Sequence, residues 1–149
     1  MTPIEGIEIK KLERVKTFNL DGKENGWLMD IMRATDEIKK NTKFAQVYVT
    51  AASPGAVKGF HWYKKKTNFF CVVKGKVKIV IIDKRASSPT KGKVNEFMVG
   101  DENPLLIKIP PYISAAFKNI GKEEALILNC PDRIFDKKDY FSSKEDYEW

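Results

Sequence analysis

Short stretches in which apolar and polar residues alternate constrain the fold of this chain more than any other feature of its sequence. The segment 43–51, KFAQVYVTA, is the clearest example, because every second residue of an extended strand points to the same side. One side carries polar and aromatic residues, namely Phe44, Gln46, Tyr48 and Thr50. The other side carries only Ala and Val. The pattern predicts a strand that lines a pocket with one face and packs with the other.

The rest of the chain repeats this kind of segment. The segment 68–83, NFFCVVKGKVKIVIID, predicts two strands joined at Lys74 and Gly75, because β-branched and aromatic residues dominate it. FHWY at 60–63 predicts a short strand with His61 and Tyr63 on one side. EFMVG, PLLIKIPP and EALILNCP predict further strands between turns. Many closely spaced short strands predict an all-β sandwich or closed barrel.

Helical character is predicted only in part of 27–41, and the segment 137–149 is predicted to form a helical turn or a loose tail. We find no repeat and no linker, so the 149 residues predict one domain, 1–149. The longest apolar run is far too short to cross a membrane. Charges occupy the N-terminal residues where a signal peptide would be apolar, which predicts a cytoplasmic protein.

The net charge limits the kinds of binding partner that we expect, and the positions of the cysteines predict their oxidation state. The formal net charge is +7, but the lysines are scattered and no basic helix is evident, so we expect no nucleic-acid partner. An anionic small molecule, such as a sugar linked through pyrophosphate, also fits the charge. The densest cluster, 64–66, is predicted to cap a solvent-facing loop, with attraction of a diphosphate as the alternative. Cys71 and Cys130 lie in apolar strands outside any C-x-x-C pair, which predicts buried reduced thiols.

Seven segments together give a family resemblance. They are IEGIEIKKL, NGWLMDIMR, FAQVYVT, PGAVKGFHW, RASSPTKG, ENPLLIKIPP and FKNIGKEEALILNCP. Their order and spacing resemble those of the dTDP-4-dehydrorhamnose 3,5-epimerases and their shorter relatives, from about Ile7 to about Pro131. The resemblance implies a cupin fold, the double-stranded β-helix or jelly-roll barrel, with minor helical segments. It also implies a homodimer.

The chemistry that the resemblance implies is proton transfer beside a ketone. The substrates of the family are 4-keto-6-deoxy sugars on a nucleoside diphosphate. A base removes the proton next to the ketone, an enolate forms, and an acid returns a proton to the opposite face. The enolate oxygen needs a positive charge or a hydrogen-bond donor. No cofactor is implied.

His61 in KGFHW matches the catalytic base of the family motif R-G-x-H, and it is the single histidine of the chain. The alternative for a lone histidine on a strand is a hydrogen-bonded structural role. Tyr48 and Tyr63 are the candidate acids, because the tyrosine that the family uses is replaced near Leu128. The family's electrophilic lysine is replaced by Asn68, which can donate a hydrogen bond without a charge.

Four positions are candidate substrate-binding residues on the same resemblance. Lys58 stands where the family has a phosphate-contacting arginine and keeps only the charge. The resemblance implies that Gln46 belongs to the strand that faces the sugar and that Asn68 takes the position of the family's electrophilic lysine. Arg85 matches a loop arginine, for which a structural role in the loop is the alternative.

Metal-dependent cupins use an H-x-H pair, a carboxylate and a later histidine. This chain has His61 followed by Tyr63, Asn68 at the carboxylate position and Ala115 at the last position, so we expect no bound metal. Two functions remain open. The first is an epimerase or isomerase of a nucleotide sugar. The second is an inactive cupin that binds a nucleotide sugar or scaffolds a polysaccharide-biosynthesis pathway.

Overall fold

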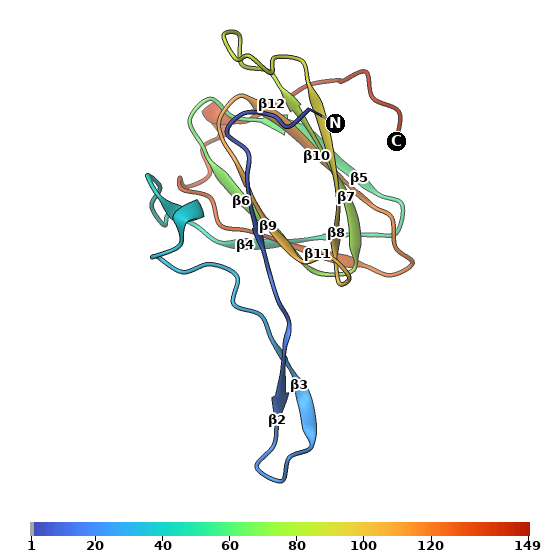
Figure 1. Cartoon of the computed structure of the whole chain (residues 1–149). Helices are drawn as coiled ribbons and strands as arrows, with labels where there is room; N and C mark the ends of the chain where they lie inside the picture. Colours follow the sequence, from blue (N-terminus) through green and yellow to red (C-terminus); the bar gives the residue numbers. More distant parts are fainter. Residues whose placement is uncertain (1) are drawn as a thin grey trace.

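Two five-stranded antiparallel sheets face each other and form the body of the protein, shown in Figure 1 as a computed structural model that describes residues 2–149. The strands of the first sheet are, in spatial order, β1 (Glu8–Lys11), β9 (Leu105–Ile109), β6 (Asn68–Lys74), β11 (Ala125–Asn129) and β4 (Tyr48–Ala52). Those of the second are β12 (Phe141–Ser142), β5 (Val57–Trp62), β10 (Ile113–Asn119), β7 (Lys76–Asp83) and β8 (Val94–Gly100). The predicted all-β class is confirmed. The two strands predicted to meet at Lys74 and Gly75 are β6 and β7, which belong to different sheets and do not pair with each other.

The main core lies between the two sheets. Alternation along β6 sends Phe70 and Val72 into this interior, where they meet residues of β7 and β11 such as Ile81 and Ile127. Burying one such side chain stabilises the fold by about 2 kcal/mol. The opposite face of β6 carries Phe69, which packs with Leu12, Ile38 and other residues outside the barrel. The inward-facing side chains of strands such as β6 therefore fill the barrel interior next to which the candidate site lies.

A two-stranded arm extends away from the barrel (Figure 1). Its strands are β2 (Val15–Phe18) and β3 (Glu24–Leu28). The helix predicted within 27–41 is wrong except for the short 3-10 helix η1 (Glu37–Lys39), because Trp27 and Leu28 pair with β2 instead. Residues 2–149 contain no helix that is long and apolar enough to cross a bilayer.

The C-terminal segment is folded onto the second sheet. A 3-10 helix, η2 (Lys137–Asp139), confirms the predicted helical turn, and β12 then pairs with β5. Beyond β12, Tyr147 and Trp149 pack against a cluster on the outer face of the sheet that includes Phe60. The expectation of a loose tail is therefore wrong, because aromatic side chains anchor the segment.

Candidate active site

His61 lies on β5 opposite Ala115 of β10, and Ser142 of β12 is its partner on the other side. Ala115 packs against the interior core, so His61, directly across from it, faces the barrel interior. Gly59 has a φ of +120°, and a Cβ there would lie 2.6 Å from the Ala115 carbonyl oxygen. Only glycine therefore lets β5 approach β10 this closely next to the histidine.

Both ring nitrogens of His61 have hydroxyl partners. Nδ1 lies 3.1 Å from Oγ of Ser142, and Nε2 lies 3.1 Å from the phenol oxygen of Tyr140. A neutral imidazole has one donor and one acceptor nitrogen, and a hydroxyl group can serve either. Burial lowers the pKa of the half-buried ring, which favours the neutral form. The arrangement holds a neutral histidine in a fixed orientation, which suits a general base.

Aromatic rings surround this histidine. The Tyr140 ring centroid lies 4.8 Å from that of His61 and 5.9 Å from that of Tyr63. Tyr63 is half-buried, and its pKa is raised, first by burial and then by Tyr48, Tyr140 and Asp139. The Tyr63 phenol therefore stays protonated at neutral pH and is available as a proton donor.

Asn68 belongs to an amide network at the end of β6. Its Oδ1 accepts a hydrogen bond of 2.8 Å from Nδ2 of Asn129, and the same amide group donates to the Tyr48 phenol at 3.0 Å. Oδ1 of Asn129 accepts from the backbone N–H of Phe69. The network connects Tyr48 to Asn68. Among residues 2–149, no group of three or more His, Cys, Asp or Glu side chains could hold a metal ion.

Lys58 connects the two sheets, whereas Gln46 contacts the C-terminal segment. The Lys58 ammonium donates to Oγ1 of Thr50 and, at 2.9 Å, to the carbonyl of Ala51, so it connects β5 to β4. Gln46 precedes β4, because the strand predicted to span 43–51 begins at Tyr48. Its Oε1 accepts a 2.9 Å hydrogen bond from the backbone N–H of Phe135 and thereby holds the C-terminal segment.

Arg85 ties down the loop after β7. Its guanidinium donates to both carboxylate oxygens of Asp83, at 2.9 and 2.7 Å, and to the carbonyl of Glu5. Asp83 is buried and also accepts hydrogen bonds from Ser88 and Thr90. These contacts support the structural alternative for Arg85.

Lys66 corrects the interpretation of the 64–66 run as solvent-facing. Lys64 and Lys65 are exposed, but Lys66 is only 3% exposed. Its Nζ lies 4.4 Å from the ring centroid of Tyr63 and 5.4 Å from that of Phe135. The third lysine therefore turns inward toward the aromatic group around His61.

Sequence reasoning missed Tyr140, Ser142 and Asn129. The i, i+2 spacing of Tyr140 and Ser142 places both on one side of an extended segment, and this is the local signal that could have grouped them. Nothing in the local sequence states that this segment pairs with β5 beside His61. Asn129 could have been found as the inward-facing residue of β11.

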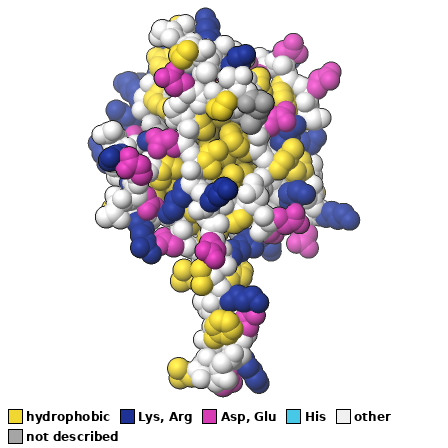
Figure 2. Space-filling model, in the orientation of Figure 1, with side chains coloured by type: hydrophobic (Ala, Val, Ile, Leu, Met, Phe, Trp, Pro, Cys, Tyr) yellow, Lys and Arg dark blue, Asp and Glu magenta, His cyan; other side chains and the backbone are white. Residues whose placement is uncertain are grey.

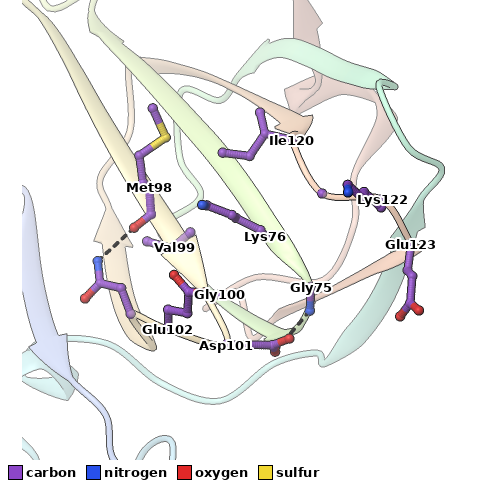
Figure 3. Close-up of a pocket in the computed structure, with 12 residues that line it drawn as sticks. Gly75, Lys76, Met98, Val99, Gly100, Asp101, Glu102, Ile120, Lys122 and Glu123 are labelled. Atoms are coloured by element: carbon purple, nitrogen blue, oxygen red, sulfur yellow. Dashed lines mark hydrogen bonds between the residues drawn. The ribbon is translucent and has the colours of Figure 1, made fainter.

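A cavity of about 770 Å³ lies at the opposite end of the barrel (Figure 3). It is formed by the turns at Gly75, Asp101 and Gly121, and the carboxylate of Asp101 accepts a hydrogen bond from the backbone N–H of Gly75. Lys76, which lines this cavity, lies five residues before Ile81 on β7. Ile81 pairs with Ala115, the residue across from His61, so it marks the level of the histidine in the barrel. At about 3.3 Å per residue the two ends are about 17 Å apart. This cavity therefore does not contain the histidine.

The double-sheet barrel with an inward-facing histidine at one end defines a cupin, as the sequence predicts. The chain belongs to the family described as the polysaccharide biosynthesis C-terminal domain, whose family model matches residues 24–141. A probable low-salt glycan biosynthesis epimerase, Agl13, of Haloferax volcanii is 28% identical over 93% of this chain and 85% of its own length. The spore coat polysaccharide biosynthesis protein SpsL of Bacillus subtilis is 25% identical over 84% of this chain and 78% of its own.

Solved structures agree with the fold. A dTDP sugar isomerase from Desulfovibrio desulfuricans superposes with a TM-score of 0.86 at 25% identity, covering 96% of this chain and 87% of its own. A dTDP-6-deoxy-D-glucose-3,5-epimerase from Legionella pneumophila, in complex with dTDP-4-keto-L-rhamnose, gives a TM-score of 0.82 at 21% identity, covering 95% and 74%. The predicted resemblance to nucleotide-sugar epimerases is confirmed.

Proposed function

We propose that this protein epimerises or isomerises a nucleoside-diphosphate 4-keto-6-deoxy sugar by moving a proton on a carbon beside the ketone. The observation that carries the proposal is the neutral, inward-facing imidazole of His61, held at both nitrogens by Tyr140 and Ser142. The relatives that are named as glycan or nucleotide-sugar epimerases and isomerases support the substrate class.

The proposed reaction begins at Nε2 of His61. In the proposed tautomer Nδ1 carries the hydrogen and donates to Oγ of Ser142, and Nε2 carries the lone pair, to which the Tyr140 hydroxyl donates in the free protein. The substrate C–H bond breaks, its proton goes to Nε2, and its electron pair forms a C=C bond while the carbonyl π electrons move to oxygen. The imidazolium then donates to Tyr140. Tyr63 or Tyr48 gives its phenol proton to the opposite face of the carbon, where the C=C electrons form the new C–H bond and the carbonyl re-forms. The phenolate then takes a proton from water and the imidazolium loses one to water, which restores the free protein.

The remaining proposed contacts bind the substrate. Lys58 connects the two sheets, and its ammonium group would attract the diphosphate. Gln46 and Asn68 would hold sugar hydroxyl groups through their amides. We propose no substrate contact for Arg85, whose guanidinium is occupied by Asp83 and Glu5.

The test is hydrogen exchange on a thymidine-diphosphate 4-keto-6-deoxy sugar in deuterated water, followed by NMR. The wild-type protein is expected to incorporate deuterium beside the ketone, and His61→Asn is expected to abolish this exchange while circular dichroism shows a folded protein. Binding of thymidine diphosphate by calorimetry is measured in parallel. Binding without exchange in the wild type would favour the inactive cupin instead.

The proposal includes a cytoplasmic homodimer. Figure 2 shows hydrophobic side chains along the arm formed by β2 and β3. The exposed large apolar residues of the arm are Val15, Phe18, Leu20, Trp27 and Leu28. Val47 and Val49 add exposed apolar surface at β4. Such surface supports contact with a second copy. The free cysteines Cys71 and Cys130 support a reducing compartment.

A further inference from the structure

Lys66 is buried without a direct ion pair, although the carboxylates of Asp139, Asp132 and Asp136 lie near enough to oppose the lowering of its pKa by burial. Within residues 2–149, the ammonium group of Lys66 forms no direct ion pair. Its Nζ lies over the ring faces of Tyr63 and Phe135. Burying a charged amine in this way is costly, so such lysines are rare outside functional sites. Ring faces attract the cation but do not use its N–H donors as an oxygen atom would.

The backbone directs this side chain toward the site. The antiparallel pairing of β6 continues beyond Asn68, because the Thr67 carbonyl accepts from the backbone N–H of Asp132 and the Thr67 N–H donates to its carboxylate. Thr67 therefore points outward like Phe69, and Lys66 shares the inward side with Asn68. The carboxylate of Asp139 accepts from the backbone N–H groups of Lys64 and Lys65 and fixes the turn before it.

A continuous series of contacts runs from Lys66 to the base. The Lys66 Nζ lies over Tyr63, the Tyr63 ring meets Tyr140, and Tyr140 is hydrogen-bonded to His61. Lys66 also borders a cavity of about 530 Å³ that opens beside β4. The Lys66 side chain therefore adjoins a space that a ligand could enter, which Asp132, Asp136 and Asp139 also line.

The proposed reaction needs a positive charge or a hydrogen-bond donor at the enolate oxygen, and Asn68 can supply only an uncharged donor. The Oδ1 of Asn68 is occupied by Asn129, and an amide carries no charge. We propose that Lys66 is the cationic donor that stabilises the enolate oxygen, from a position two residues before Asn68 on the same face. The inference rests on the proposed function. When the C–H pair moves toward oxygen, a Lys66 N–H donates to that oxygen and the ammonium keeps its proton.

The experiment compares Lys66→Met with Lys65→Met in the exchange assay at saturating substrate. Both changes remove one charge from the same run, but Lys65 is exposed. Lys66→Met is expected to lower the exchange rate by about 100-fold or more, as loss of an oxyanion donor does. Lys66→Arg is expected to keep the rate within about tenfold of wild type because the charge remains. Lys65→Met should match wild type.

Two further measurements separate a functional lysine from other roles. Thymidine-diphosphate affinity should be the same in Lys66→Met and wild type. The melting temperature of Lys66→Met should be unchanged or higher, because a buried charge without a direct ion pair has been removed. A wild-type exchange rate in Lys66→Met would overturn the inference. So would a lower rate that is accounted for by weaker binding of the diphosphate. Unfolding of both Lys66→Met and a second uncharged variant, Lys66→Gln, would also overturn it, because the rate loss would then be structural. Exchange absent from the wild type would refute the proposed function itself.

Discussion

The phenol oxygen of Tyr140 lies 3.1 Å from Nε2 of His61, although 79 residues separate them in the chain. Two residues further on, Ser142 meets the other ring nitrogen. The short C-terminal segment 140–142, which includes β12, therefore sets the orientation of the single histidine, and with it the direction from which a proton can be taken. The C-terminal segment and the barrel strand β5 therefore both contribute side chains to the candidate site.

Tyr140→Phe tests that relationship. The ring contacts remain while the hydroxyl is lost, so the exchange rate should fall by about tenfold to 100-fold, the range of one acid–base contact. Folding stability should change by about 1 kcal/mol, the net contribution of one hydrogen bond. Tyr147→Phe is the matched control, since its hydroxyl bonds Glu96 on the outer face. An equal or faster rate in Tyr140→Phe would mean that this phenol only covers the base.

The pH dependence of His61 follows from its lowered pKa. Burial favours the neutral ring, so NMR titration of this single imidazole should give a pKa below 6.5. The unfolded chain binds the proton more readily, so the stability difference between wild type and His61→Gln should shrink as the pH falls below 6.5. Above that pH both states are neutral and the difference is constant. A pKa above 6.5 would contradict the burial argument.

Tyr63→Phe and Tyr48→Phe separate the candidate acids. A base alone can remove and return a proton on one face, so losing the acid should spare deuterium exchange and abolish inversion. Tyr63 adjoins Tyr140, whereas Tyr48 is held by Asn129, so we expect Tyr63→Phe to reduce inversion by at least about 100-fold relative to exchange. Product configuration and deuterium content are read in one NMR experiment. Inversion lost only in Tyr48→Phe would reverse the assignment.

The sequence was sufficient for the features that depend on local pattern. The β-branched and aromatic residues of 68–83 and the glycine at 75 predicted β6, β7 and the turn that joins them, and the residues around His61 identified the candidate base. The arm was not predicted, because the residues of β3 resemble a helix start and only their pairing with β2 makes them a strand.

The missing parts of the site depend on contacts between distant segments. Residues 64–66 are all lysine, yet only the third, Lys66, is buried. The difference arises because Asp139, more than seventy residues away, bonds the backbone of the first two and leaves the third to follow β6. Neither the hydrophobic periodicity nor the secondary-structure propensities of residues 60–70 can predict which of the three lysines is buried.

Asp83→Asn tests the loop anchor without touching the proposed chemistry. Burial alone would raise the pKa of this carboxyl, but hydrogen bonds from Arg85, Ser88 and Thr90 hold it well below its usual range. Removing the charge leaves Arg85 uncompensated and should cost about 3–5 kcal/mol. Asp101→Asn, which weakens a half-exposed pair with Arg14, should cost about 1 kcal/mol or less.

Denaturant unfolding at pH 7 measures both Asp variants. Because the folded pKa of Asp83 is lowered, its contribution should be complete above about pH 4, the unfolded value, and decline as the pH falls below it. The exchange rate of the folded Asp83→Asn protein should remain near wild type. Equal destabilisation by the two variants would contradict the burial argument.

Leu20→Asp tests the proposed role of the arm in dimerisation. Leu20 is 111% exposed at the arm tip, so its replacement should not alter the folded monomer. A two-fold dimer buries the residue twice, and about 2 kcal/mol for each copy makes about 4 kcal/mol, or roughly a thousandfold in the dissociation constant. Sedimentation should therefore show a dimer for wild type and a monomer for Leu20→Asp at micromolar concentration. Lys23→Gln changes the net charge of the arm equally and should stay dimeric, and a wild-type monomer, or a dimer that survives Leu20→Asp, would contradict the proposed contact.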